Sequence, residues 1–226
     1  MLKKLLHYIG KILLALFLLS LLTVLVYRFV FPPITPLMVI RSCSSDSDRG
    51  WDYTYKKVPL EDISQNMILA VMGGEDDEFM QHHGFNFKQI KMAYEEQKSG
   101  RRFRGGSTIS QQCAKNVFLS PRQSYLRKGL EAYFTVMIEF VWGKKRIMEV
   151  YLNVIEFGDG IYGIEAASQY YFHKSAKKLT RNEAARLAAV LPSPRKRNPL
   201  QNTSYMIRQT KHIQWMMGCI GHVDFK

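Results

Sequence analysis

The stretch SYLRKGLEAYFTVMIEFVWG, residues 124–143, indicates what kind of fold this chain adopts. It opens on Ser124, a residue type that caps helix N-termini, and it closes at Gly143. Between them apolar side chains recur at helical spacing, at Leu126, Leu130, Tyr133, Met137 and Phe140. The stretch therefore predicts a long amphipathic helix that packs on the protein core through this stripe.

Helical signals continue on both sides of this stretch. Residues 62–72 carry apolar residues four apart before Gly73-Gly74, and residues 86–99 carry Phe87, Ile90 and Tyr94 on one side before Gly100. Two capping boxes, Thr108-x-x-Gln111 and Thr180-x-x-Glu183, open further helices, the second of which runs to Pro192. Only WDYTYKKV, residues 51–58, alternates as a short strand would. The pattern predicts a mainly α-helical domain.

The N-terminal region predicts a membrane anchor. ILLALFLLSLLTVLVY, residues 12–27, has no charge, and with the apolar residues after Arg28 it reaches the roughly 20 residues that cross a bilayer. Lys3, Lys4 and Lys11 precede it, which keeps the N-terminus in the cytoplasm. A cleaved signal peptide is the alternative, although no small-x-small cleavage site follows the apolar run.

These signals divide the 226 residues into consecutive parts. We expect a cytoplasmic N-terminus (1–11), a transmembrane helix (12–31), a linker and membrane-proximal segment (32–56), a catalytic domain (57–200) and a C-terminal helical segment (201–226). The apolar segment VFPPITPLMVI, residues 30–40, either flanks the anchor at the membrane or packs on the domain.

The amino-acid composition limits the classes of partner that this chain is expected to bind. The chain has 32 Lys and Arg against 19 Asp and Glu, a net charge of +13, which favours an anionic partner such as a membrane surface, a phosphorylated substrate or nucleic acid. A domain outside the cytoplasm does not meet nucleic acid, so we expect no nucleic-acid partner. The three cysteines, Cys43, Cys113 and Cys219, have no metal spacing, and their odd number argues against a disulfide framework.

Acidic residues are concentrated in GGEDDEFMQHHGF, residues 73–85. Glu75 and Asp76 follow the expected helix end, and Phe79 and Phe85 would hold this turn against the core and partly dry its carboxylates. Desolvation raises a carboxyl pKa and makes the group a better base near neutral pH. A solvated acidic loop is the alternative. The adjacent His82 and His83 do not have the spacing of a zinc motif.

Basic and polar residues gather around the next two helix starts. Arg101, Arg102 and Arg104 lead into Gly105-Gly106 before a helix N-terminus, a pattern that suits an anion, and Gln112 and Lys115 lie within that helix. A solvated helix face explains the polar residues about as well.

Glu131 has Arg127 four residues and Lys128 three residues before it, so both cations can reach its carboxylate along the helix. In a half-buried cleft these cations would keep Glu131 ionised beside a negatively charged ligand.

At this point the chain resembles the monofunctional peptidoglycan glycosyltransferases, membrane-anchored enzymes that polymerise lipid II. The family's blocks occur in order across about residues 57–199. They are Glu75-Asp76-x-x-Phe79-x-x-His82-x-Gly84, GGSTI-x-QQ-x-x-KN at 105–116, Arg127-Lys128-x-x-Glu131, Lys144-x-x-Ile147-x-x-x-Tyr151-Leu152-Asn153, and RLAAVLPSPRKRNP at 186–199.

The resemblance implies a lysozyme-like helical fold with two lobes around a long cleft. It implies catalytic roles for Glu75, as general base on the acceptor sugar's 4-hydroxyl, and for Glu131, near the donor pyrophosphate. Beside Glu75, Asp76 is expected to orient groups or hold a water. The implied substrate-binding residues are Asp76, Phe79, Gly106, Ser107, Gln112, Lys115, Arg122 and Arg127. The family's arginine before the third block is one residue out of register here, where Gln123 follows Arg122.

The implied reaction is inverting. The sugar's bond to undecaprenyl pyrophosphate breaks and a β-1,4 bond forms, with Lys115 and Arg127 taking up the leaving group's charge. No cofactor is required, although a divalent cation (Mg²⁺ or Mn²⁺) could assist. The expected partners are lipid II, the growing glycan and membrane lipids, with cell-division or elongation proteins as further candidates. The expected location is the inner membrane, with a single pass and a periplasmic catalytic domain.

Two other functions fit parts of the sequence. A lytic, lysozyme-like hydrolase would share the fold but has little use for the cluster of Lys115, Arg127 and Lys128 on a neutral polysaccharide. A non-catalytic membrane scaffold would bind lipid without needing Glu75. The sequence contains no region long enough for a transpeptidase, so we expect no cross-linking activity.

Overall fold

The structure is a computed structural model that describes residues 1–44, 52–98, 106–122 and 124–225. Residues 45–51 of the expected linker and membrane-proximal segment (32–56) lie outside the described residues, as does the cluster of Arg101, Arg102, Arg104 and Gly105. The elements are α1 (Leu2–Phe29), α2 (Pro36–Ser42), β1 (Thr54–Tyr55), η1 (Leu60–Asp62), α3 (Gln65–Glu75), α4 (Phe87–Lys98), α5 (Ile109–Phe118), α6 (Tyr125–Val141), α7 (Gly143–Val154), β2 (Glu156–Gly158), β3 (Ile161–Tyr162), α8 (Ile164–Phe172), η2 (Ala176–Lys178), α9 (Arg181–Val190) and α10 (Ser204–Ile220). The prediction of a mainly helical protein is confirmed, and the expected strand at 51–58 appears as the short β1.

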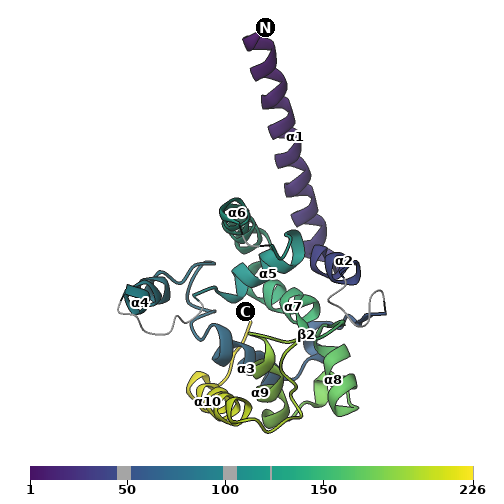
Figure 1. Cartoon of the computed structure of the whole chain (residues 1–226), viewed down its shortest axis with the longest axis vertical. Helices are drawn as coiled ribbons and strands as arrows, with labels where there is room; N and C mark the ends of the chain where they lie inside the picture. Colours follow the sequence, from purple (N-terminus) through teal and green to yellow (C-terminus); the bar gives the residue numbers. More distant parts are fainter. Residues whose placement is uncertain (45–51, 99–105, 123, 226) are drawn as a thin grey trace.

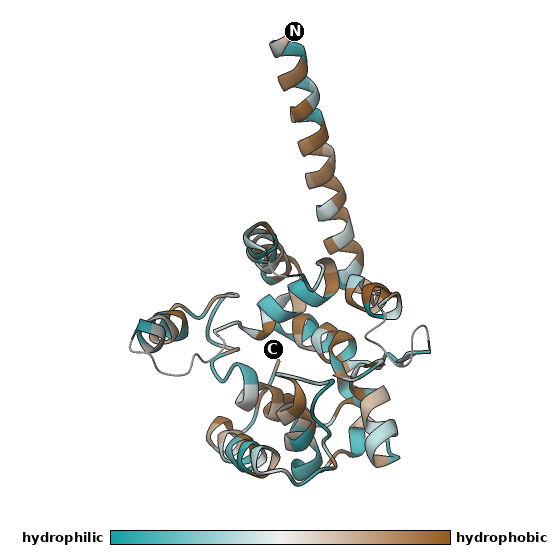
Figure 2. Cartoon of the chain, in the orientation of Figure 1, coloured by the Kyte–Doolittle hydropathy of each residue, from teal (hydrophilic) through white to brown (hydrophobic). Residues whose placement is uncertain are grey.

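Helix α1 stands out from the rest of the molecule (Figure 1) and is apolar along most of its length (Figure 2). Its span Lys3–Phe29 is long and apolar enough to cross a membrane. Together these properties fit a single-pass membrane anchor.

Side chains of the domain bind the C-terminal end of α1 by donating hydrogen bonds to backbone carbonyls of this helix. The indole N–H of Trp142 donates to the carbonyl of Val24 at 2.7 Å, and the Arg146 guanidinium donates to the carbonyl of Tyr27 at 2.9 and 3.1 Å. Ser20 and Tyr133 join their hydroxyls at 2.7 Å. The last turns of the anchor are therefore part of the folded domain.

The other helices form two groups that meet at the site described below (Figure 1). Helix α5 packs between α6 and α7, and α6 also contacts α1. Helices α3, α9 and α10 pack on one another as a second group. A small sheet in the order β1-β3-β2, with β1 parallel and β2 antiparallel to β3, lies beside α8.

The expected helix end at Gly73-Gly74 is wrong, because α3 continues through both glycines to Glu75. A Cβ at Gly73 would lie 2.9 Å from the Cβ of Met216, and one at Gly74 would lie 3.3 Å from Ile213 Cδ1. The glycines therefore let α10 approach α3 closely. Glu75 consequently belongs to a packed helix and not to an acidic loop.

The expected core stripe of α6 is wrong at Leu126, Leu130 and Phe140, although Met137 packs against the core and Tyr133 is partly buried. Leu126 is 76% exposed and Phe140 is 92% exposed, while Glu131, Thr135 and Ile138 form the buried face. Helix α4 likewise leaves Phe87 and Ile90 exposed. The predicted stripe of α4 is therefore wrong at these two positions.

Part of the segment at 30–40 packs on the domain, as one of the two alternatives proposed. Leu37 and Met38 of α2 are buried against Tyr162, while Val39 and Ile40 are exposed beside the base of α1. A largely apolar hollow of about 500 Å³ lies there, with Tyr27, Ile34, Val39 and Phe118 in its wall.

Candidate active site

Glu75, the last residue of α3, is half-buried where the two helix groups meet. Its Oε2 accepts a hydrogen bond from Gln112 Nε2 of α5 at 2.7 Å. Burial raises the pKa of Glu75 above its ordinary value, and the Asp76 carboxylate adds to this rise. The Gln112 hydrogen bond, Lys115 and Arg197 oppose it by favouring the charged form. Glu75 is thus a more basic carboxylate than a solvated glutamate, a change that favours a general base.

Gln112 is held in one orientation by a second hydrogen bond. The buried Tyr151 hydroxyl of α7 donates to Gln112 Oε1 at 3.2 Å, so the amide nitrogen faces Glu75. Burial raises the pKa of Tyr151 well above its ordinary value, so the phenol keeps its proton and remains a donor. A chain of hydrogen bonds between side chains of α7, α5 and α3 therefore fixes the position of the Glu75 carboxylate.

Lys115 lies one helical turn along α5 from Gln112, between two carboxylates. Burial lowers the pKa of Lys115, while the charges of Glu131 and Glu75 raise it. A lysine with little water around it and acids on two sides is a strong local cation for an anionic group. The structure thus brings Glu75, Gln112, Lys115 and Glu131 together.

Glu131 is 2% exposed, and cations occupy both of its oxygens. Arg127 Nη1 lies 2.5 Å from Oε2, and Lys128 Nζ is ion-paired with Oε1. Because both partners are on the same helix, this carboxylate fixes two cations beside Lys115. Glu131 therefore has no free oxygen for proton transfer in this arrangement.

Asp76 was expected to bind substrate, but its carboxylate is buried and bonded to other protein groups. It is 2% exposed, and its Oδ2 accepts from the backbone N–H of Ile109 at 3.0 Å. His82 Nε2 donates to the same carboxylate at 2.9 Å, because its Nδ1 accepts from the Gly84 N–H and so carries no proton. Asp76 thereby joins the end of α3 to the start of α5.

The helix N-terminus predicted as an anion site is already occupied. Asp76 takes the Ile109 N–H, and the capping box of Thr108 and Gln111 satisfies the N–H groups of both residues. Gly106 and Ser107 precede this cap, and the Ser107 carbonyl accepts from Gln112 at 3.5 Å. The start of α5 therefore has a structural role.

Two further residues expected to bind substrate are placed elsewhere. Phe79 is fully buried, with Lys144 Nζ 4.5 Å from its ring centre, so it cannot touch a ligand. Arg122 is exposed in the segment after α5 and does not line the pocket beside Lys115.

Arg197 was not among the predicted site residues, and its guanidinium acts on the charge of Glu75. Its guanidinium lies 3.9 Å from the Tyr205 ring centre and lowers the pKa of Glu75. Its buried Nη1 has no hydrogen-bond partner among the described residues. Its sequence signals were its place in the family block at 186–199 and in the basic run of residues 195–197.

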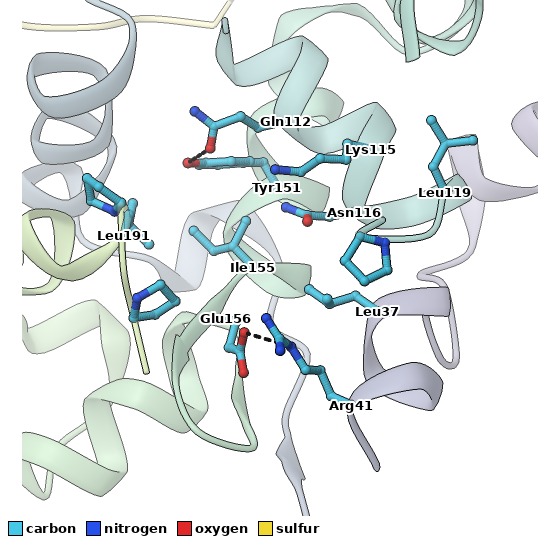
Figure 3. A pocket seen from close by; sticks show the side chains of 13 residues that line it. Leu37, Arg41, Gln112, Lys115, Asn116, Leu119, Tyr151, Ile155, Glu156 and Leu191 are labelled. Atoms are coloured by element: carbon cyan, nitrogen blue, oxygen red, sulfur yellow. Dashed lines mark hydrogen bonds and ion pairs between the residues drawn. The ribbon is translucent and has the colours of Figure 1, made fainter. Parts of the chain in front are cut away.

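A pocket of about 250 Å³ opens beside this cluster (Figure 3). Gln112, Lys115 and Tyr151 lie at one end, and Arg41 and Glu156 lie at the other. Within the described residues, no group of three or more His, Cys, Asp or Glu side chains could hold a metal ion.

A desolvated carboxylate near partly buried cations, on a helical domain with an apolar N-terminal helix, suits the class of enzyme that acts on an anionic substrate. The comparisons with known proteins agree with this class. A family model described as Transglycosylase matches residues 49–217. The chain belongs to the transglycosylase family and is a glycosyltransferase.

Named relatives match nearly the whole chain. It is 52% identical to the biosynthetic peptidoglycan transglycosylase of Caulobacter vibrioides over 93% of this chain and 91% of the relative. Proteins of the same name from Bdellovibrio bacteriovorus and Bacteroides thetaiotaomicron are 50% and 44% identical, covering 91% and 96% of this chain and 83% and 88% of the relatives.

Proposed function

We propose that this protein is a peptidoglycan glycosyltransferase that polymerises lipid II into β-1,4 glycan strands and releases undecaprenyl pyrophosphate. The observation that carries the proposal is the arrangement of Glu75 and Lys115. A desolvated carboxylate, held by Gln112, lies near a buried cation that is itself beside Glu131 and its two ion-paired partners.

In the proposed reaction Glu75 removes the proton from the acceptor's 4-hydroxyl. The freed oxygen forms a bond to C1 of the donor sugar, while the bond from C1 to the pyrophosphate oxygen breaks and that oxygen keeps the electron pair. Lys115 and Arg127 stabilise the resulting negative charge. At an effective dielectric constant of about 20, a cation about 4 Å away contributes about 4 kcal/mol of attraction before desolvation.

The surroundings of the site suit a substrate that stays in the bilayer. The exposed apolar residues of α6 lie on the helix that contacts α1, and Val39 and Ile40 are exposed near the same end of the anchor. We propose the inner membrane as the location, with a cytoplasmic N-terminus and a periplasmic catalytic domain. The proposal assigns no peptide cross-linking to these residues.

The test is a polymerisation assay with labelled lipid II on the full chain and on Glu75→Gln. We expect the wild type to form polymer and release undecaprenyl pyrophosphate. The variant should lose at least about a hundredfold in rate, the lower range for removal of a general base, with an unchanged melting temperature. Shortened glycan in place of polymer would indicate a hydrolase, and full activity of Glu75→Gln would indicate a scaffold.

A further inference from the structure

The end of the pocket away from Lys115 carries a polar pair that the proposed reaction does not use. Arg41 comes from α2, next to the anchor, and Glu156 begins β2. Their side chains face each other across the pocket end in Figure 3, with Arg41 Nε 3.9 Å from Glu156 Oε2. This is an ion pair, but the separation is too long for a hydrogen bond.

Each member of the pair keeps one unsatisfied buried atom. Neither Arg41 Nε nor Glu156 Oε1 has a hydrogen-bond partner among the described residues. Glu156 is 7% exposed, and a backbone hydrogen bond from Gly160 serves its carboxylate without satisfying Oε1. Buried polar groups in native proteins nearly always have a hydrogen-bond partner. An unsatisfied donor beside an unsatisfied acceptor in a pocket wall therefore indicates that a ligand supplies both hydrogen bonds.

The hydrogen-bonding properties of Arg41 Nε and Glu156 Oε1 define the chemical group that could bind between them. Arg41 Nε can only donate. Burial raises the pKa of Glu156 to about 7, and in its ionised form the Glu156 carboxylate can only accept. An amide offers the complement, since its C=O accepts and its N–H donates from adjacent atoms. A phosphate would meet Arg41 but would be repelled by Glu156, and a cation would have the reverse problem. Leu37, Ile155 and Pro194 also line this pocket and provide apolar contacts for an uncharged group.

We propose that Arg41 and Glu156 form a subsite that binds an amide group of the glycan substrate. The proposal rests on the proposed function for the identity of that substrate. Its amides come from two sources, the acetamido groups of the sugars and the peptide bonds of the stem. The subsite lies in the same pocket as Lys115, so a substrate whose phosphates reach Lys115 can extend its polar portion to the pair.

The kinetic test compares Arg41→Met and Arg41→Lys in the full chain. Methionine keeps the apolar stem and removes the donor, while lysine keeps the charge that pairs with Glu156. We expect KM for the lipid-linked substrate to rise about tenfold or more in both variants, with kcat nearly unchanged. Arg208→Met, which removes an exposed arginine on α10 outside the pocket, should leave KM unchanged. Equal melting temperatures of the variants establish that they are folded.

Substrate variants identify the amide. If a substrate with a hydroxyl in place of an acetamido group shows the raised KM with wild type and no further rise with Arg41→Met, the sugar amide is the ligand. If removal of the stem peptide has this effect, the peptide amide is the ligand. Either result supports the subsite. An unchanged KM in Arg41→Met, full rescue by Arg41→Lys, or the same increase for every substrate would overturn it.

A binding measurement separates this proposal from the proposed function. Wild type and Arg41→Met are titrated with a soluble N-acetylated disaccharide by NMR. Weaker binding by the variant supports the subsite even if no polymer forms in the assay. Equal binding, together with unaltered KM in an enzyme that polymerises lipid II, would reject the subsite alone.

Discussion

At the scale of single residues, Glu75 shows how environment sets function. Burial raises its pKa, whereas Gln112, Lys115 and Arg197 lower it. The balance matters because a general base must be deprotonated at working pH and still attract a proton. Gln112 and Lys115 both belong to α5, whereas Arg197 lies in the segment that connects α9 to α10.

Replacing Arg197 with glutamine should therefore change the pH dependence of the reaction. Without this cation the pKa of Glu75 rises further, so a smaller fraction of Glu75 is ionised at any pH near that pKa. We expect the acidic limb of the kcat/KM profile to move to higher pH, with a larger loss of activity at low pH than at high pH. The measurement is polymerisation rate against pH for both proteins.

The control for this prediction is Lys211→Gln, which removes one exposed positive charge from α10. Its profile should coincide with that of the wild type. A uniform loss at all pH values in Arg197→Gln would mean that Arg197 acts on binding or on folding and not on the pKa of Glu75.

The residues of the site differ in how far the sequence predicts them. Glu75, Gln112, Lys115 and Glu131 were predicted as one site from the resemblance, and the structure brings them together. The sequence did not predict that Asp76 and Phe79 are buried, because a motif shows which residues occur together and not which of them face a ligand. Arg197 is far from Glu75 in the sequence, and the two residues come close only because α3, α9 and α10 pack on one another.

At the scale of elements, the two glycines of α3 permit a close helix contact. Gly73→Ala places a Cβ 2.9 Å from Met216 Cβ, an atom that cannot move without its backbone. The resulting overpacking should outweigh alanine's better helix propensity and lower the free energy of unfolding by about 1–3 kcal/mol. Thermal unfolding of the full chain in detergent is the measurement.

Gly129 is the matched control because it lies inside α6 with nothing within 4 Å of its missing Cβ. Gly129→Ala should raise the free energy of unfolding by about 0.5–1 kcal/mol, which is the propensity difference alone. If both substitutions stabilise the protein, α10 does not pack closely on Gly73.

Helix α6 shows why an apolar stripe does not identify a core. Its buried face holds Glu131, Thr135 and Ile138, because the ion pairs with Arg127 and Lys128 satisfy the carboxylate inside. Its apolar residues at 126, 130 and 140 lie outside, on a helix that contacts the anchor. Periodicity reports that a face avoids water, but it does not distinguish protein from lipid on the other side.

At the scale of the whole molecule, the anchor and the active site are parts of one framework. Trp142 and Arg146, which hold the end of α1, lie at the start of α7, and α7 also carries Tyr151 of the site. The same helix thus sets the direction of the anchor and the position of Gln112 beside Glu75. The orientation of the pocket relative to α1 is therefore fixed by these contacts.

Exchanging parts of α1 for an unrelated apolar helix tests this coupling. Exchange of residues 2–18 removes no contact described above, so stability and polymerisation should stay near wild type. Exchange of residues 19–29 removes Ser20, the packing of Val24 in the core and that of Tyr27 beside it. At about 1 kcal/mol for each lost interaction, the free energy of unfolding should fall by about 2–4 kcal/mol. Polymerisation of lipid II in vesicles should fall with it, because the pocket loses its set orientation above the bilayer. Equal melting temperatures and equal rates for the two exchanges would show that α1 is a passive tether, and that α7 positions the site without help from the anchor.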